Sequence, residues 1–189
     1  PAFYLEVEQN LNTKLSVRYG FRISSFFRIG NQVLSTYKDN APVIYNSEEG
    51  IYQSAEPIGE ETYKKGKSIK SFIGFEPRFS LSYKLNDESS LKGSFQRINQ
   101  YLHLISNTNA PTPLDVWAPS GKFIKPQQSN QYALGYFKNF RDEKYSLEVE
   151  SYYKTVSNRI DYIDGANLIA NNTIETEILQ GESRAYGLE

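Results

Sequence analysis

The chain lacks cysteine and methionine, and it contains one histidine and one tryptophan among its 189 residues. Without cysteine it can form neither a disulfide framework nor a thiolate metal site. A single histidine leaves only carboxylate partners for a metal, and nothing supports a Ser/His/Asp or Cys/His catalytic set. We therefore expect no metal, no cofactor and no catalytic residues, so the chain is not expected to be an enzyme.

The sequence also lacks long apolar runs and clusters of basic residues, and both absences exclude classes of protein. No run of about 18 consecutive apolar residues occurs, which excludes a transmembrane helix. Lysine plus arginine (21) nearly balance aspartate plus glutamate (22), and no basic cluster is interleaved with aromatics, which argues against nucleic acid as a partner. The chain has no initiator methionine and Pro1 leads straight into a strand pattern, so we expect a segment of a longer protein.

Apolar and polar side chains alternate with a period of two residues along parts of the chain. Between Lys14 and Phe27, one parity is apolar and the other polar or small; the apolar parity comprises Leu15, Val17, Tyr19, Phe21 and Ile23. Such alternation predicts a β-strand with one apolar and one polar face. At ~3.3 Å per residue and a tilt near 45°, this segment is long enough to cross an apolar band ~25 Å tall.

The same pattern recurs and predicts about seven strands, at residues 3–8, 14–27, 68–85, 91–100, 130–140, 145–155 and 184–189. Short polar turns at 10–13, 86–89 and 141–143 alternate with long loops at 31–67, 101–129 and 159–183. Pro77 cannot donate to a ladder, so we expect a bulge or a locally unpaired position there. Alternating short and long connections are typical of an antiparallel up-and-down transmembrane β-barrel with short periplasmic turns and long external loops.

If the apolar parity faces lipid, the other parity lines a lumen. The expected lumen-facing residues include Arg18, Arg22, Glu76, Arg78, Glu148 and Glu150. Their mixed sign suits a barrel interior that contacts a folded plug, whereas a lining of one sign would suggest an ion-selective pore. The alternative is a soluble sandwich in which the same charges are simply solvated. Seven strands are too few to close alone, so we expect an arc of a larger barrel.

Three stretches carry a resemblance to a known family. They are residues 75–83 (FEPRFSLSY), residues 101–117 with YLHLISNT followed by PTPLDVW, and residues 184–189 (RAYGLE). Together they resemble the β-barrel of TonB-dependent outer-membrane receptors, most closely the branch found in Bacteroidetes.

The resemblance implies a barrel of about 22 strands in the bacterial outer membrane, surrounded by lipid and filled by the protein's own N-terminal plug. It also implies partnership with the TonB complex, energised uptake of a nutrient, and a surface lipoprotein as a further partner. Residues 1–189 would then be a partial barrel domain without the plug. The competing function is a soluble all-β binding or adhesion module. A barrel hydrolase is a third possibility, but it needs an acid/base cluster that we do not find.

The loop at residues 101–129 is the expected site of ligand contact, because external loops of such barrels meet the cargo first. It combines aromatic and polar side chains on a frame stiffened by four prolines; the candidates are Tyr101, His103, Asp115, Trp117 and Lys122. In the competing interpretation, Trp117 and the run 101–105 pack inside the loop. The identity of the ligand does not follow from the sequence.

Overall fold

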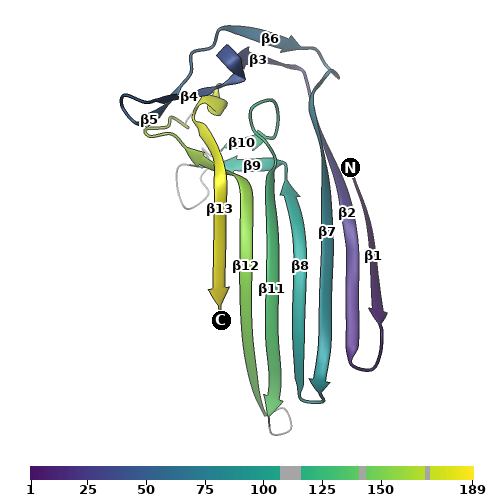
Figure 1. The fold of residues 1–189 in the computed structure, drawn as a ribbon. Helices are drawn as coiled ribbons and strands as arrows, with labels where there is room; N and C mark the ends of the chain where they lie inside the picture. Colours follow the sequence, from purple (N-terminus) through teal and green to yellow (C-terminus); the bar gives the residue numbers. More distant parts are fainter. Residues whose placement is uncertain (107–115, 141–143, 169–170) are drawn as a thin grey trace.

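Seven long strands form one antiparallel sheet in the computed structural model, which describes residues 1–106, 116–140, 144–168 and 171–189 (Figure 1). The strands are β1 (Ala2–Asn10), β2 (Leu15–Ile29), β7 (Ser68–Asn86), β8 (Ser89–Gln100), β11 (Gln127–Phe140), β12 (Tyr145–Tyr162) and β13 (Ile178–Leu188). They lie side by side in this order, so each strand pairs with its neighbours along the chain and the predicted up-and-down sheet is confirmed. The first and last strands form the two edges.

The alternation in the sequence produces two chemically distinct faces, because directly paired residues of an antiparallel sheet share a face. Arg18 of β2 is opposite Glu8 on one side and Ser80 on the other. One residue along, Tyr19 is opposite Val7 and Phe79. The pairing carries this separation across the sheet, giving a polar face and an apolar face.

Two of the predicted short turns are built by asparagine side chains. Oδ1 of Asn12 accepts from the backbone N–H groups of Lys14 and Leu15, both at 2.8 Å. Oδ1 of Asn86 accepts from the N–H of Glu88 at 3.0 Å and from the hydroxyl of Ser89 at 2.8 Å. These bonds close the turns at the same end of the sheet, because asparagine mimics a backbone acceptor. The third predicted turn, 141–143, lies outside the described residues.

The ladder around Pro77 is interrupted on one side, as expected. Pro77 stays in register with Phe21 of β2, and β7 remains paired with β2 back to Ser68. The ladder between β7 and β8 begins only at Arg78, which is paired with Gln96. A residue without an N–H group therefore lies where β8 parts from β7.

The start of the last strand was predicted wrongly. β13 begins at Ile178, and its pairing with β12 shifts register between Ser157 and Arg159. Asn158, at this irregularity, has a positive φ of 56°. The extra residue belongs to β12, whereas residues 180–183 of β13 carry no apolar side chain, so no apolar period marks the start of β13 in the sequence.

The long connections at the opposite end are more ordered than predicted. Residues 31–67 contain two short antiparallel pairs, β3 (Gln32–Thr36) with β6 (Gly59–Tyr63) and β4 (Val43–Asn46) with β5 (Ile51–Ser54). In the second connection β9 (Leu102–Ile105) pairs with β10 (Val116–Pro119). Short 3₁₀ turns cover Lys38–Asn40 and Ile174–Thr176. Strands of four or five residues are too short to show a sustained period, which is why the sequence pattern missed them.

The hydrophobic core lies at this loop end and not on the sheet. Ile105, Ala118, Ile124, Leu168 and Ile178 form a buried cluster drawn from the second and third connections and the start of β13. Among the residues that the structure describes, no helix is long and apolar enough to span a membrane.

Candidate functional site

The apolar face of the sheet has no covering layer within the described part of the chain. Large side chains stay open over its whole width, including Ile73 at 79%, Leu134 at 59% and Tyr186 at 73% of their full exposure. The residues that are buried and apolar are instead those of the loop end, such as Tyr37, Tyr63 and Ile105. A sandwich would require a second layer against this face, since such an apolar surface is costly in water.

One row of this face is aromatic on six consecutive strands of the sheet. The residues, each directly opposite the next, are Tyr19, Phe79, Phe95, Tyr132, Tyr153 and Tyr186. The ring centroids of Phe95 and Tyr132 are 4.9 Å apart, within the range of favourable aromatic contact. Cross-strand aromatic pairs of this kind stabilise a sheet and fix its register.

The apolar segment shifts along the strands across the sheet. On the loop side of the aromatic row, β2 continues with Phe21 and Ile23, whereas β8 and β11 continue with Arg97 and Asn130, which share a hydrogen bond of 2.7 Å. On the turn side, β12 has Ser151 and is then apolar at Val149 and Leu147. The displacement toward the turns is the pattern of strands that cross an apolar band at a tilt.

The polar face holds the expected charged residues of both signs. Arg18, Arg22, Glu76, Arg78, Glu148 and Glu150 all lie on it by register. Nε of Arg18 donates to Oε1 of Glu6 at 2.8 Å, and Nη1 of Arg22 lies 3.8 Å from Oε2 of Glu76. An exposed pair such as Arg18–Glu6 adds little stability, so its position on the face matters more than its energy.

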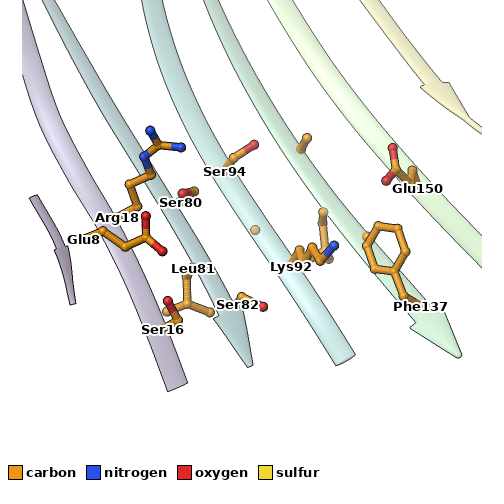
Figure 2. A pocket seen from close by; sticks show the side chains of 14 residues that line it. Glu8, Ser16, Arg18, Ser80, Leu81, Ser82, Lys92, Ser94, Phe137 and Glu150 are labelled. Atoms are coloured by element: carbon orange, nitrogen blue, oxygen red, sulfur yellow. The ribbon is translucent and has the colours of Figure 1, made fainter. Parts of the chain in front are cut away.

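A hollow of about 670 Å³ lies on the polar face toward the turn end. Its lining includes the small residues Ser80, Ser94 and Gly135. Charged side chains also line it (Figure 2). Glu8 and Arg18 lie on one side, and Lys92 and Glu150 on the other. Nζ of Lys92 lies 4.2 Å from the ring centre of Phe137. The hollow offers a shallow polar surface with balanced charge.

Glu76 differs from the other charged residues of this face, because it is only 1% exposed. Its Oε1 accepts from the hydroxyl of Ser24 at 2.6 Å, and that hydroxyl lies 2.8 Å from the hydroxyl of Tyr101. Since the Ser24 proton is used on Glu76, Tyr101 is the donor of the second bond. The Tyr101 ring also stacks on Phe26 with centroids 5.3 Å apart. A chain of hydrogen bonds thus connects the start of the second long connection to the seven-stranded sheet.

The three long connections contact one another and form a single body, which we call the loop cap (residues 31–67, 101–126 and 163–177, as far as they are described). The hydroxyl of Tyr37 donates to Glu175 at 3.0 Å, and that of Ser54 donates to Glu177 at 2.9 Å. Glu177 also accepts from the N–H of Asn167 at 3.0 Å. The first and third connections are therefore joined by two buried or half-buried carboxylates.

The second connection joins the first through charge and ring contacts. Nζ of Lys122 lies 3.3 Å from Oε2 of Glu61. The Tyr37 ring meets Phe123 edge to face, with centroids 5.2 Å apart. Hydrogen bonding to Tyr63, followed by the Lys122 contact, lowers the pKa of the Glu61 carboxyl. Burial, with the nearby Glu175 charge, raises the pKa of the Tyr37 phenol above its usual range.

The expected ligand residues occupy different environments in the cap. Tyr101 is committed to Ser24, and His103 is 3% exposed with Nε2 3.0 Å from the hydroxyl of Ser120. Burial lowers the pKa of His103, which favours the neutral ring. Trp117 is 60% exposed, and Lys122 is partly covered beside Glu61. Asp115 lies outside the described residues.

Several residues that organise the cap have no signal in the sequence. Tyr37 and Glu175 are 138 positions apart, and Ser54 and Glu177 are 123 apart. In the sequence each looks like an ordinary polar loop residue, and only the folded chain brings the pairs together.

Comparison with known proteins gives one match. A family model described as "TonB dependent receptor-like, beta-barrel" matches residues 2–189. No curated protein and no solved structure matches the chain.

Proposed function

Because the chain belongs to the family of TonB-dependent receptor-like β-barrels, whose members are outer-membrane receptors and transporters rather than enzymes, we propose that it takes part in energised uptake of a nutrient ligand. In this proposal residues 1–189 are an arc of the barrel wall. Strands outside this chain segment pair with the free edges of β1 and β13, since an unpaired edge inside a bilayer leaves backbone groups without partners. A barrel of about 22 strands accommodates such an arc.

The observation that carries the proposal is the uncovered apolar face opposite a polar one across seven strands. In a bilayer the apolar side chains meet acyl tails and the polar side chains meet the lumen, so neither face needs a second protein layer. The shift of the apolar segment across the strands supports a tilted crossing. The soluble binding module lacks such support, because it needs a layer against this face.

Each surface then has a role in the uptake cycle. The loop cap faces the exterior and meets the ligand first, with the exposed Trp117 as one contact. The polar face lines the lumen, and the hollow near the turns receives part of the N-terminal plug, whose mixed polar surface its balanced charges fit. The TonB complex acts on the full-length protein from the periplasmic side. The stretches 75–83 and 184–189 support membership of the Bacteroidetes-type branch.

A glutamate-specific protease tests the orientation, because both ends of the sheet offer exposed targets. Glu48 and Glu49 lie in the tight connection between β4 and β5, and Glu88 lies in the turn between β7 and β8. We expect cleavage after Glu48 or Glu49 in intact cells, and after Glu88 only when the outer membrane is permeabilised. Cleavage at Glu88 in sealed cells would reject the orientation. Recovery of the chain in the soluble fraction without detergent would reject the membrane role.

A further inference from the structure

A second pocket lies on the polar face, nearer to the loop end than the hollow. It has a volume of about 450 Å³ and is formed by β1, β2 and β7 at the edge of the sheet. Tyr4, Glu6, Arg22 and Arg78 are among its lining residues, and we call it the arginine pocket. Along β2, Arg22 lies closer to the loop cap than Arg18, which borders the hollow. Solutes that enter from the loop end therefore reach the arginine pocket first.

The register places the two guanidinium groups as diagonal neighbours around a residue without a side chain. Arg78 is directly opposite Gly20, and Arg22 follows Gly20 by two positions on the same face. Tyr4 is directly opposite Arg22 on the other side and is 76% exposed. Long side chains at diagonal positions reach each other across a sheet. Two arginines and a phenol thus lie close together beside Gly20, around the pocket.

Positive charge is in excess at this pocket. Three arginines, Arg18, Arg22 and Arg78, lie near two carboxylates, Glu6 and Glu76. Arg18 uses Nε and Nη2 on Glu6 and is neutralised by that contact. Arg78 has neither a hydrogen bond nor an ion pair within the described ranges of the chain. One guanidinium is consequently left with its charge and all of its donors free.

Arg22 is only loosely held by its carboxylate. Its Nη1 lies 3.8 Å from Oε2 of Glu76, which is beyond hydrogen-bond distance. Glu76 is buried and turned toward Ser24, and its Oε2 is one of the buried atoms without a hydrogen-bond partner. The Arg22 side chain is 46% exposed. It can therefore donate into the pocket while Glu76 keeps its bond to Ser24.

We propose that Arg22 and Arg78 bind an anionic oxygen group of the transported ligand, a phosphate or a carboxylate, with the Tyr4 hydroxyl as a third donor. The inference rests on the proposed uptake function and deepens it by naming the chemistry of the cargo. Planar guanidinium forks match phosphate and carboxylate oxygens in a bidentate manner. The pocket suits a ligand rather than the plug, because its net charge is positive and it faces the route from the loops.

The test measures binding of inorganic phosphate and of acetate by calorimetric titration. The protein is used as the cell makes it, extracted in detergent, and each variant is first checked for strand content by circular dichroism. We expect millimolar binding of at least one of the two anions, and the stronger of the two identifies the group. Arg78→Gln should weaken this binding about tenfold, the effect of losing a charge-assisted hydrogen bond.

Arg184→Gln is the matched control, because it removes the same charge from an exposed residue on the apolar face. It should change anion affinity less than twofold. Equal losses in both variants would mean that binding follows net charge, and this would overturn the proposal. So would the absence of binding of either anion up to about 50 mM, well above the millimolar range. Arg78→Lys is the second variant, which keeps the charge and should lose the bidentate part of the affinity.

Failure of this inference is separable from failure of the proposed function. The protease experiment reads orientation without any ligand. Correct cleavage together with absent anion binding would reject the arginine pocket alone, whereas incorrect cleavage would reject the uptake role.

Discussion

The hydroxyl of Tyr101 lies 2.8 Å from the hydroxyl of Ser24, although 77 positions separate the two residues. Through this bond the second long connection is attached to the polar network of Glu76 at the point where β8 has already parted from β7. The bond has a direct effect on how firmly the base of the loop cap is held.

Replacing Tyr101 with phenylalanine should loosen that base while keeping the stacking on Phe26. The loss of one buried hydrogen bond costs about 1 kcal/mol. Amide exchange at residues 100–105 should accelerate accordingly. Ser24→Ala should cost more, about 1–3 kcal/mol, because it also removes the donor to the buried Glu76 carboxylate.

Tyr132→Phe is the control for both variants, since this exposed tyrosine on the apolar face has no hydroxyl hydrogen bond to any described residue. It should leave exchange at 100–105 unchanged. Unaltered exchange in Tyr101→Phe as well would show that the bond does not hold the cap.

Acid should weaken the pairing of β9 with β10 through His103. Burial holds the folded pKa of His103 below its ordinary 6.5, so the unfolded state binds the proton more readily. The stabilisation is complete above pH 6.5 and is lost as the pH falls below it, with a slope of at most about 1.4 kcal/mol per pH unit. Fluorescence of the single tryptophan, Trp117, reports this directly, because Trp117 is opposite Leu104 in the same hairpin.

His103→Gln should flatten this pH dependence while retaining a polar group near Ser120. A dependence that persists in the variant would assign the titration to another residue.

A methyl group at Gly20 should push β1 away from β2. A Cβ at this position would lie 2.4 Å from the carbonyl oxygen of Leu5 and 2.8 Å from Cα of Glu6, and backbone cannot yield as a flexible side chain can. Overpacking of this kind costs about 1–3 kcal/mol. The midpoint of unfolding in urea should fall for Gly20→Ala. Gly181→Ala is the matched control in another strand, where a Cβ meets nothing within 4 Å.

Charge on the apolar face should impair insertion, whereas charge on the polar face should not. Leu134 and Ala133 are consecutive residues of β11 that point to opposite faces. Leu134→Arg should cost about 2–4 kcal/mol if it meets the middle of the bilayer. Ala133→Arg meets the polar hollow. The measurement is the fraction of each variant that is recovered folded in the membrane. Equal recovery of the two variants would contradict the assignment of the faces.

The sheet could be predicted from the sequence because its signal is local. Leu15 to Ile23 alternate without interruption, and Asn86 sits where a turn needs a side-chain acceptor. The start of β13 could not be predicted, since residues 180–183 carry no apolar side chain that would show the alternation. The short strand pairs within residues 31–67 were not predicted either, because each strand is too short to show a sustained alternation.

The candidate site was harder to predict because its contacts are distant in the chain. Tyr101 and His103 were predicted as ligand contacts; in the structure the first is bonded to Ser24 and the second to Ser120. Nothing near Tyr37 in the sequence indicates that Glu175 accepts a hydrogen bond from its hydroxyl. The charged residues of the polar face could be assigned to one face from parity alone. Parity did not reveal that Glu76 is covered, or that Arg78 has no bonded partner among the described residues.

The hydrophobic cluster around Ile105 and Ile178 belongs to the part of the chain outside the apolar band. Two solvents therefore stabilise two regions: water drives the cluster together, and lipid accommodates the strands. Urea should act first on the cluster, whereas a change of detergent chain length should act on the strands. The buried cluster and the membrane strands of one polypeptide thus respond to different agents, the first to denaturant and the second to the surrounding amphiphile.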